Sequence, residues 1–320
     1  MLRICLIALS LILAATAPAV AQYPDRTVKI IVPFPPGGTT DILARIIGAQ
    51  LEKRLGRAFV VENRGGASGN IGTAAVAQSA PDGYTLLMGT INTHGINAGL
   101  FKNLPYDTEK DFAPITVAAS TPNVLLVHPS LGVGTVAELI ALAKDKPGDL
   151  SFGSTSTGGS PHMSGELLKV LTNTDIRHIP YKGGGPMLND LIGGHIKMAF
   201  DNLPSAIGHI RSGKVRALAV TTPKRWPGLP DVPTMAESGV PGYDVSAWFG
   251  LFAPAKTPRE IVDLLYRDVR EILKEEPIRD RLTELGAEPV GNTPDEFARQ
   301  IAAEVKKWRD VVASTGVKAE

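Results

Sequence analysis

A strand, a glycine-rich loop and a helix follow one another repeatedly along this chain, and this order restricts the fold more than any other feature. The first unit joins a β-branched segment, 28–32, to the loop 33–41 and to a helix with apolar residues at helical spacing over 42–55. Similar units occupy 59–78 and 150–171. Strands that alternate with helices form sheets covered on both faces, so the pattern predicts a parallel, doubly wound α/β fold.

Two of the glycine-rich loops have the features of anion sites. The loop 33–41 carries Gly37 and Gly38, and the loop 154–162 carries a second glycine pair before a helix that we expect to start at Pro161 with Ser160 as its cap. Neither loop contains lysine or arginine. Since the first amides of a helix lack partners inside it, both loops could hold a negative group through backbone N–H groups. The alternative for the first loop is a turn stiffened by prolines.

The first 21 residues predict a secretory signal peptide. Arg3 gives a positive start, an apolar run covers 4–13, and Ala19-Val20-Ala21 is typical of a site cleaved after Ala21. The only cysteine, Cys5, lies in this segment, so the mature chain would have no disulfide, thiolate nucleophile or cysteine-ligated metal. We therefore expect a secreted protein.

Composition argues against a polyanion such as nucleic acid as the partner and against a membrane-spanning protein. Removal of Arg3 from the 33 basic residues balances them against the 32 acidic ones. No basic run with interleaved aromatic residues is present, so nucleic acid is not an expected partner. About 300 mature residues usually form two lobes. We expect lobe 1 to contain 22–123 and 247–320, and lobe 2 to contain 124–246, with the apolar strand 124–127 and the strand 244–253 at the crossings.

Catalytic motifs are absent from the sequence. It has no Gly-x-Ser-x-Gly elbow, no dinucleotide fingerprint, no phosphate loop and no His-x-x-x-His pair, so we expect neither catalytic residues nor a metal or cofactor. A secreted hydrolase with Ser160 as nucleophile and His162 as base remains an alternative, although such a pair needs a third orienting group.

Polar residues at other predicted strand ends extend the candidate site. Asn92 and Thr93 lie in a polar loop at 89–95, and Asp201 begins another at 201–205. Asp41 would repel a carboxylate at close range, so we expect it to fix the loop geometry; an amine on the ligand could meet Asp41 or Asp201. The predicted ligand-binding residues are Phe34, Gly37, Gly38, Thr39, Asp41, Asn92, Thr93, Ser154, Thr157, Gly158, Gly159, Ser160, His162, Tyr181, Asp201, Asn202 and Ser205.

Motifs along nearly the whole mature chain resemble one known family. They include Pro33-Phe34-x-x-Gly37-Gly38-x-x-Asp41, Pro81-Asp82-Gly83-Tyr84, Ile179-Pro180-Tyr181-Lys182-Gly183 and Trp248-Phe249-Gly250-Leu251-Phe252. The chain is thereby similar to the Bug-type periplasmic receptors of the tripartite tricarboxylate transporter family. The resemblance implies a two-lobed, type II-like periplasmic binding protein that closes like a flytrap, so the compartment of the secreted chain would be the periplasm.

The resemblance also implies a function. It suggests that loops 34–41 and 154–162, one per lobe, hold one carboxylate of a small organic acid through backbone amides and water. It further implies a monomer that delivers this acid to membrane transporter subunits; a partner sensor kinase is the alternative. The ligand stays open among dicarboxylates, tricarboxylates, amino acids and aromatic acids.

Overall fold

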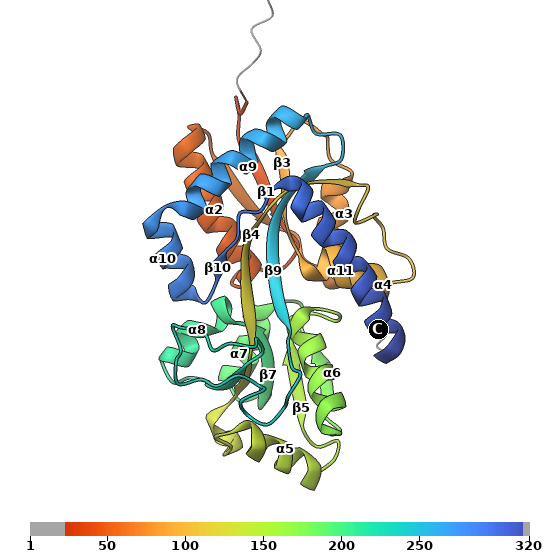
Figure 1. Ribbon diagram of the computed structural model, residues 1–320, viewed down its shortest axis with the longest axis vertical. Helices are drawn as coiled ribbons and strands as arrows, with labels where there is room; N and C mark the ends of the chain where they lie inside the picture. Colours follow the sequence, from red (N-terminus) through yellow and green to blue (C-terminus); the bar gives the residue numbers. More distant parts are fainter. Residues whose placement is uncertain (1–22, 316–320) are drawn as a thin grey trace, which may run out of the picture.

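The computed structural model describes residues 23–315 and has two lobes joined by two long strands, β4 and β9 (Figure 1). The predicted signal peptide lies outside the described residues. One mixed sheet forms in each lobe, and β4 belongs to both. In lobe 1 the strand order is β2 (Phe59–Asn63), β1 (Val28–Val32), β3 (Thr85–Thr90), β9 (Ser246–Pro254), β4 (Phe112–Val127) and β10 (Glu288–Pro289). In lobe 2 it is β8 (Arg216–Val220), β4, β7 (Met198–Asn202), β5 (Ser151–Ser154) and β6 (Arg177–Pro180).

The two-lobed α/β class is confirmed, but the sheets are not wholly parallel. Pairing is parallel among β2, β1 and β3 and among β7, β5 and β6. By contrast, β9 runs antiparallel to both β3 and β4. The reason is the path of the chain, which leaves lobe 1 along β4 and returns along β9 in the opposite direction.

The strand β4 is continuous, whereas the sequence predicts separate strands at 115–119 and 124–127. Its residues up to Pro122 pair with β9, and from Asn123 onward they pair with β7 and β8. Pro122 is tolerated because it stands where one partner set ends and the next begins. We propose that the lobes meet at the predicted positions, 123/124 and 246/247.

Helices cover both faces of each sheet. Those of lobe 1 are α2 (Thr39–Leu55), α3 (Asn70–Ala77), α4 (Asn97–Leu100), α9 (Arg259–Lys274), α10 (Glu276–Leu285) and α11 (Pro294–Thr315). Those of lobe 2 are α5 (Val136–Asp145), α6 (Ser160–Thr172), α7 (Gly184–Ile192) and α8 (Leu203–Arg211). Short turns form at η1 (Ala67–Gly69), η2 (Asn92–Ile96) and η3 (Pro129–Leu131).

Two segments that were expected as loops are ordered. The segment 89–95 is the end of β3 followed by the π-helical turn η2, and 203–205 starts α8. Thr135, Thr257 and Thr293 each precede a glutamate by three residues, a pattern that predicts a helix start with a capping glutamate. Capping boxes form at Thr135 and Thr293. A helix also starts after Thr257, but without the capping box, because the Thr257 hydroxyl donates to the carbonyl of Pro254 and Pro258 takes the cap position.

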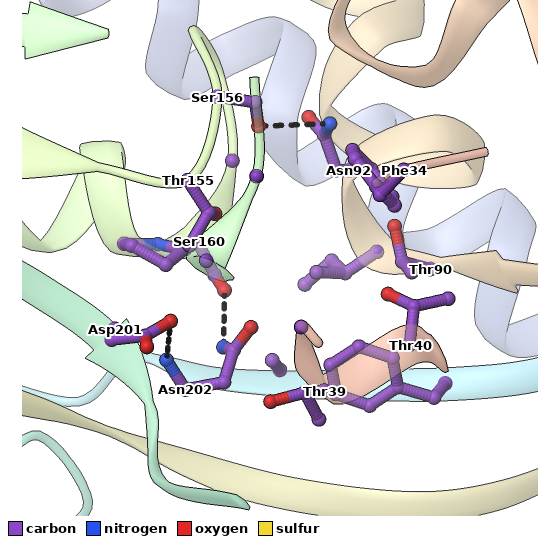
Figure 2. Close-up of a pocket in the computed structure, with 18 residues that line it drawn as sticks. Phe34, Thr39, Thr40, Thr90, Asn92, Thr155, Ser156, Ser160, Asp201 and Asn202 are labelled. Atoms are coloured by element: carbon purple, nitrogen blue, oxygen red, sulfur yellow. Dashed lines mark hydrogen bonds between the residues drawn. The ribbon is translucent and has the colours of Figure 1, made fainter. Parts of the chain in front are cut away.

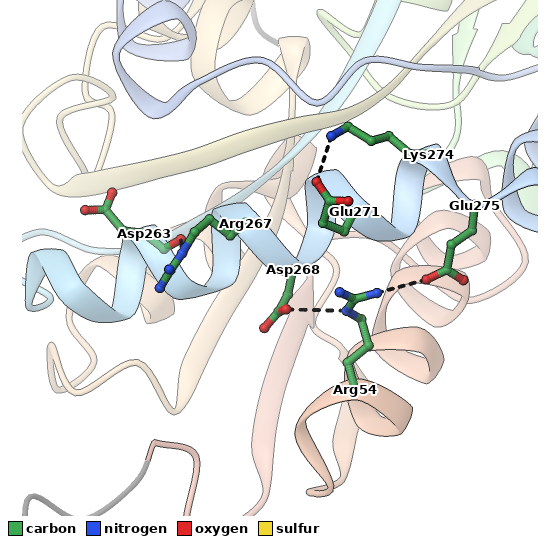
Figure 3. Close-up of polar contacts among 7 residues, drawn as sticks. All are labelled: Arg54, Asp263, Arg267, Asp268, Glu271, Lys274 and Glu275. Carbon is green, nitrogen blue, oxygen red and sulfur yellow. Dashed lines mark hydrogen bonds and ion pairs between the residues drawn. The ribbon is translucent and has the colours of Figure 1, made fainter.

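Each lobe has its own apolar core, and surface ion pairs tie the outer helices together. Figure 3 shows α9 lying against α2, where Arg54 bonds Asp268 at 3.3 Å and Glu275 at 3.0 Å. Such partly exposed pairs contribute little to stability, so burial of the cores dominates. Among residues 23–315, no helix is both long and apolar enough to cross a membrane.

The close approach of α6 to β5 yields a stability prediction. A methyl group at Gly165 would overlap the ring of Phe152, which is fully buried. We expect Gly165→Ala to lower the free energy of unfolding by about 1 to 3 kcal/mol because overpacking forces the core apart. The matched control is Gly208→Ala on α8, where a Cβ meets open space and the helix gains up to about 1 kcal/mol. Equal urea midpoints for the two variants would contradict this packing.

Candidate functional site

A cavity of about 40 Å³ lies between the two lobes. Figure 2 shows Phe34, Thr39, Thr40 and Asn92 on one side of it and Ser156, Ser160, Asp201 and Asn202 on the other. The complete lining is Phe34, Gly38, Thr39, Thr40, Thr90, Ile91, Asn92, Ala247 and Phe249 from lobe 1, and Thr155, Ser156, Gly159, Ser160, Pro161, Gly183, Gly184, Asp201 and Asn202 from lobe 2. We call this space the central cavity.

The lobes are closed over the central cavity. Thr39 Oγ1 in lobe 1 donates to Ser205 Oγ in lobe 2 at 3.2 Å. At another point, Asn92 Nδ2 donates to Ser156 Oγ at 3.3 Å (Figure 2). Both bonds join buried side chains of different lobes, so opening the lobes would break them.

Two helices begin at the central cavity, one from each lobe. Gly38 is the N-cap of the 17-residue α2, and Gly159 is the N-cap of the 13-residue α6. Neither cap has a side-chain hydrogen bond to the first turn. The lining contains no lysine, arginine or histidine. An anion here would therefore be held by amides, hydroxyls and the positive ends of two helix dipoles.

The predicted cap of α6 is wrong by one residue. Gly159 takes the cap position, and Ser160 is already helical. This frees the Ser160 hydroxyl to bond Asn123 Oδ1 at 3.2 Å and to lie 3.4 Å from Asn202 Nδ2. Asn123 also accepts from Asn202 at 2.6 Å, so the three side chains form one buried network. Asn123 was missed because a single polar residue beside an apolar strand gives no signal.

Asp41 stabilises the first loop from behind. Its carboxylate accepts from the Gly37 amide at 3.0 Å, from Arg45 at 3.0 Å and from Asn63 at 3.0 Å. Burial opposes ionisation of Asp41, but these hydrogen bonds outweigh it and hold its pKa below the usual value. The Gly37 amide, predicted to face an anion, is thus already engaged by Asp41.

The serine and histidine pair of the hydrolase alternative does not form. The ring of His162 accepts from the Gly158 amide through Nδ1 at 2.9 Å, and it stacks on His178 at 3.7 Å between ring centroids. His178 instead contacts the buried Ser154 Oγ at 2.7 Å and is itself partly buried. Burial lowers the pKa of His178 to about 3. These side chains support the loop 154–162.

The predicted residues divide into three groups. The central cavity is lined by Phe34, Gly38, Thr39, Asn92, Gly159, Ser160, Asp201 and Asn202. Thr157 and Tyr181 line a second cavity of about 230 Å³ that shares Phe34 and Ser156 with the first. Lying outside both linings are Gly37, Asp41, Thr93, Ser154, Gly158, His162 and Ser205.

Several lining residues were missed. Thr155 and Ser156 stand in a loop that was singled out, and Gly183 and Gly184 belong to a glycine-rich run, so a reading of whole loops would have included them. Phe249 lies on β9 and reaches the cavity through the return crossing, which no local pattern indicates. Within the described residues, no group of three or more metal-ligating side chains gathers.

Two lobes joined by crossing strands and closed over a polar cavity define a solute-binding receptor of the periplasmic binding protein class. A family model described as "Tripartite tricarboxylate transporter family receptor" matches residues 43–317, and the chain belongs to this family. Its members are periplasmic solute-binding receptors and not enzymes, which confirms the non-catalytic prediction.

Individual relatives match over nearly their full length. Protein BugT of Bordetella pertussis (strain Tohama I) is 41% identical over 297 residues, which cover 92% of this chain and 91% of BugT. The structure of R. palustris Rpa4515 with adipate has a TM-score of 0.91 and 43% identity, covering 92% and 99% of the two chains. MatC (Rpa3494) from Rhodopseudomonas palustris with bound malate has a TM-score of 0.86 and 37% identity, covering 91% and 100%.

The role of Asp41 yields a pH prediction. The pKa of Asp41 is lower in the folded chain than in the unfolded one, so its stabilisation is present above the unfolded pKa and is lost as pH falls through the folded pKa. We expect Asp41→Asn to cost about 1 to 3 kcal/mol at pH 7 and progressively less toward pH 3. Urea unfolding at both pH values measures this, with the exposed Asp145→Asn as control. A cost that does not vary with pH would refute the ionised role.

Proposed function

We propose that this chain captures a small carboxylate-bearing solute in the periplasm and delivers it to the membrane subunits of a tripartite tricarboxylate transporter. The observation that carries the proposal is the pair of uncapped helix starts, Gly38 and Gly159, which face one closed cavity from opposite lobes. Relatives with the same fold are known with adipate and with malate, both carboxylates.

Binding would work by closing the lobes. A ligand shifts such an equilibrium only through contacts that are better in the closed form. A carboxylate between α2 and α6 meets this condition, since it reaches the amides of both helices only when the lobes are closed. Hydroxyls of Thr39, Thr40 and Ser160 would complete its hydrogen bonds, together with ordered water.

The remaining assignments extend this proposal. We expect the chain to be secreted with cleavage after Ala21 and to act as a monomer. We expect the predicted ligand-binding residues either to contact the ligand or to support the loops that do. The second candidate function is sensing, in which the chain binds the same solute but acts on a sensor kinase. Loss of acid uptake by cells that lack this chain would favour the transporter, whereas intact uptake with altered transcription would favour the kinase.

A thermal-shift screen tests the binding function. The panel contains adipate, malate, citrate, acidic amino acids and aromatic acids. A ligand that binds only the folded chain raises the free energy of unfolding by RT ln(1 + [L]/Kd), about 2.7 kcal/mol at a concentration of 100 Kd. We expect saturable stabilisation by at least one acid. A flat response across the whole panel would overturn the receptor function.

A substitution at the second cap tests the location of the site. A Cβ at Gly159 would lie 2.7 Å from Ser156 Oγ, another lining residue, so Gly159→Leu adds a bulky side chain at the cavity wall where we propose that the anion binds. The backbone of Gly159, with a φ of −70°, accepts a side chain without strain. We expect a loss of at least tenfold in affinity with the fold retained. The control Gly208→Leu adds the same side chain at an exposed position of α8 and should bind normally. Equal affinities of the two variants would place the ligand elsewhere.

A further inference from the structure

Asp201 is the only residue lining the central cavity that has an ionisable side chain. It stands at the end of β7 and is 1% exposed. In Figure 2 it lies on the lobe 2 side beside Asn202, across the cavity from Thr39. A carboxylate ligand and an ionised Asp201 would therefore share a closed space without a cationic side chain.

The hydrogen bonds of Asp201 allow it to carry a proton. Its Oδ1 accepts from the Asn202 amide at 2.8 Å, and its Oδ2 accepts from Ser205 Oγ at 2.7 Å. Ser205 Oγ also lies 2.9 Å from the Asn202 carbonyl oxygen, which can accept the hydrogen bond of the Ser205 hydroxyl in place of Asp201. Protonated Asp201 would then have its own O–H free to donate while every neighbour stays satisfied.

No charged partner compensates Asp201 from the surrounding elements. On α2, Asp41 is paired with Arg45, and on α7, Asp190 accepts from a tyrosine. The paired strand β4 carries no ionisable side chain. On α6, which also packs against β7, Glu166 lies 3.7 Å from His162 and pairs with Lys169 at 2.8 Å. The remaining groups of α2 and α8 lie toward the far ends of those helices: Glu52, Lys53, Arg54, His209 and Arg211. Burial therefore dominates and raises the pKa of Asp201 to about 7, while the hydrogen bonds from Ser205 and Asn202 lower it by a smaller amount.

We propose that Asp201 sets the ligand affinity by taking up one proton from solvent when a carboxylate binds and by donating it as a hydrogen bond to a ligand oxygen. This inference rests on the proposed function, since it assumes a carboxylate in the central cavity. The proton bonds to Asp201 on closure and returns to solvent on release, so no other reactant is needed.

The sign of the pH dependence follows from this linkage. The negative charge of the ligand raises the pKa of Asp201 further, so the complex binds more protons than the free chain. Affinity is then highest at low pH and falls by up to tenfold per pH unit once Asp201 in the free chain is ionised. The ligand itself contributes nothing there, because ordinary carboxyl groups are ionised well below pH 7.

The opposite outcome has a distinct meaning. If the ligand carries an ammonium group, an ionised Asp201 would accept from it directly. Binding would then favour the ionised form of Asp201, protons would be released, and affinity would rise with pH. Asp201→Asn would weaken this binding most at high pH.

Proton uptake is measured by titration calorimetry at pH 7.5 in two buffers of different ionisation enthalpy. The probe is the acid of the panel with the largest thermal shift, with adipate tried first. We expect uptake approaching one proton for the wild type and for the control Asp145→Asn, and close to zero for Asp201→Asn. Ser205→Ala removes a bond that favours ionised Asp201, so its loss of affinity should begin at higher pH.

The outcomes separate the two proposals. Binding without proton uptake in the wild type, equal uptake in Asp201→Asn, or proton release would overturn the role of Asp201 and leave the receptor function standing. At pH 6 the inference expects Asp201 to be protonated both in the free chain and in the complex. Absence of binding by every acid at this pH would overturn the receptor function itself and this inference with it.

Discussion

The proposed function depends on one electrostatic constraint: a carboxylate in the central cavity would have to be held without any cationic side chain in the lining. Backbone amides and helix dipoles meet this demand only if helix starts point at the same place. Here α2 and α6 do so from opposite lobes, through Gly38 and Gly159. Neither helix start alone would enclose a ligand, so in the proposed function recognition and closure are the same event.

The long strands make this arrangement possible. Because β4 pairs with β9 in lobe 1 and with β7 and β8 in lobe 2, one strand belongs to both sheets. Its Asn123 stands at the change of partners and bonds to Ser160 and Asn202 in the cavity wall. The crossing thus positions the loop 154–162 of lobe 2 directly. Asp41 has the equivalent role in lobe 1, where it holds the Gly37 amide and so shapes the first loop.

The sequence was informative where local chemistry decides structure. Glycine-rich loops between strands and helices predicted the fold class, and the glutamates after Thr135 and Thr293 predicted two helix caps. Eight of the residues predicted to bind a ligand line the central cavity. It was weak where distant segments meet. The pairing of β9 with β4, the approach of Phe249 to the cavity and the network around Asn123 depend on long-range register, which no local pattern carries. The cap of α6 was misplaced because serine and glycine both suit that position, and the geometry of Asn123 decides between them.

The most direct test of the account is a crystal structure of the chain with the acid that stabilises it most. The account predicts one carboxylate group in the central cavity, within hydrogen-bond distance of first-turn amides of both α2 and α6, with the lobes closed. A ligand held only in the neighbouring cavity lined by Thr157 and Tyr181, or a carboxylate bound by a lysine or arginine side chain, would contradict it.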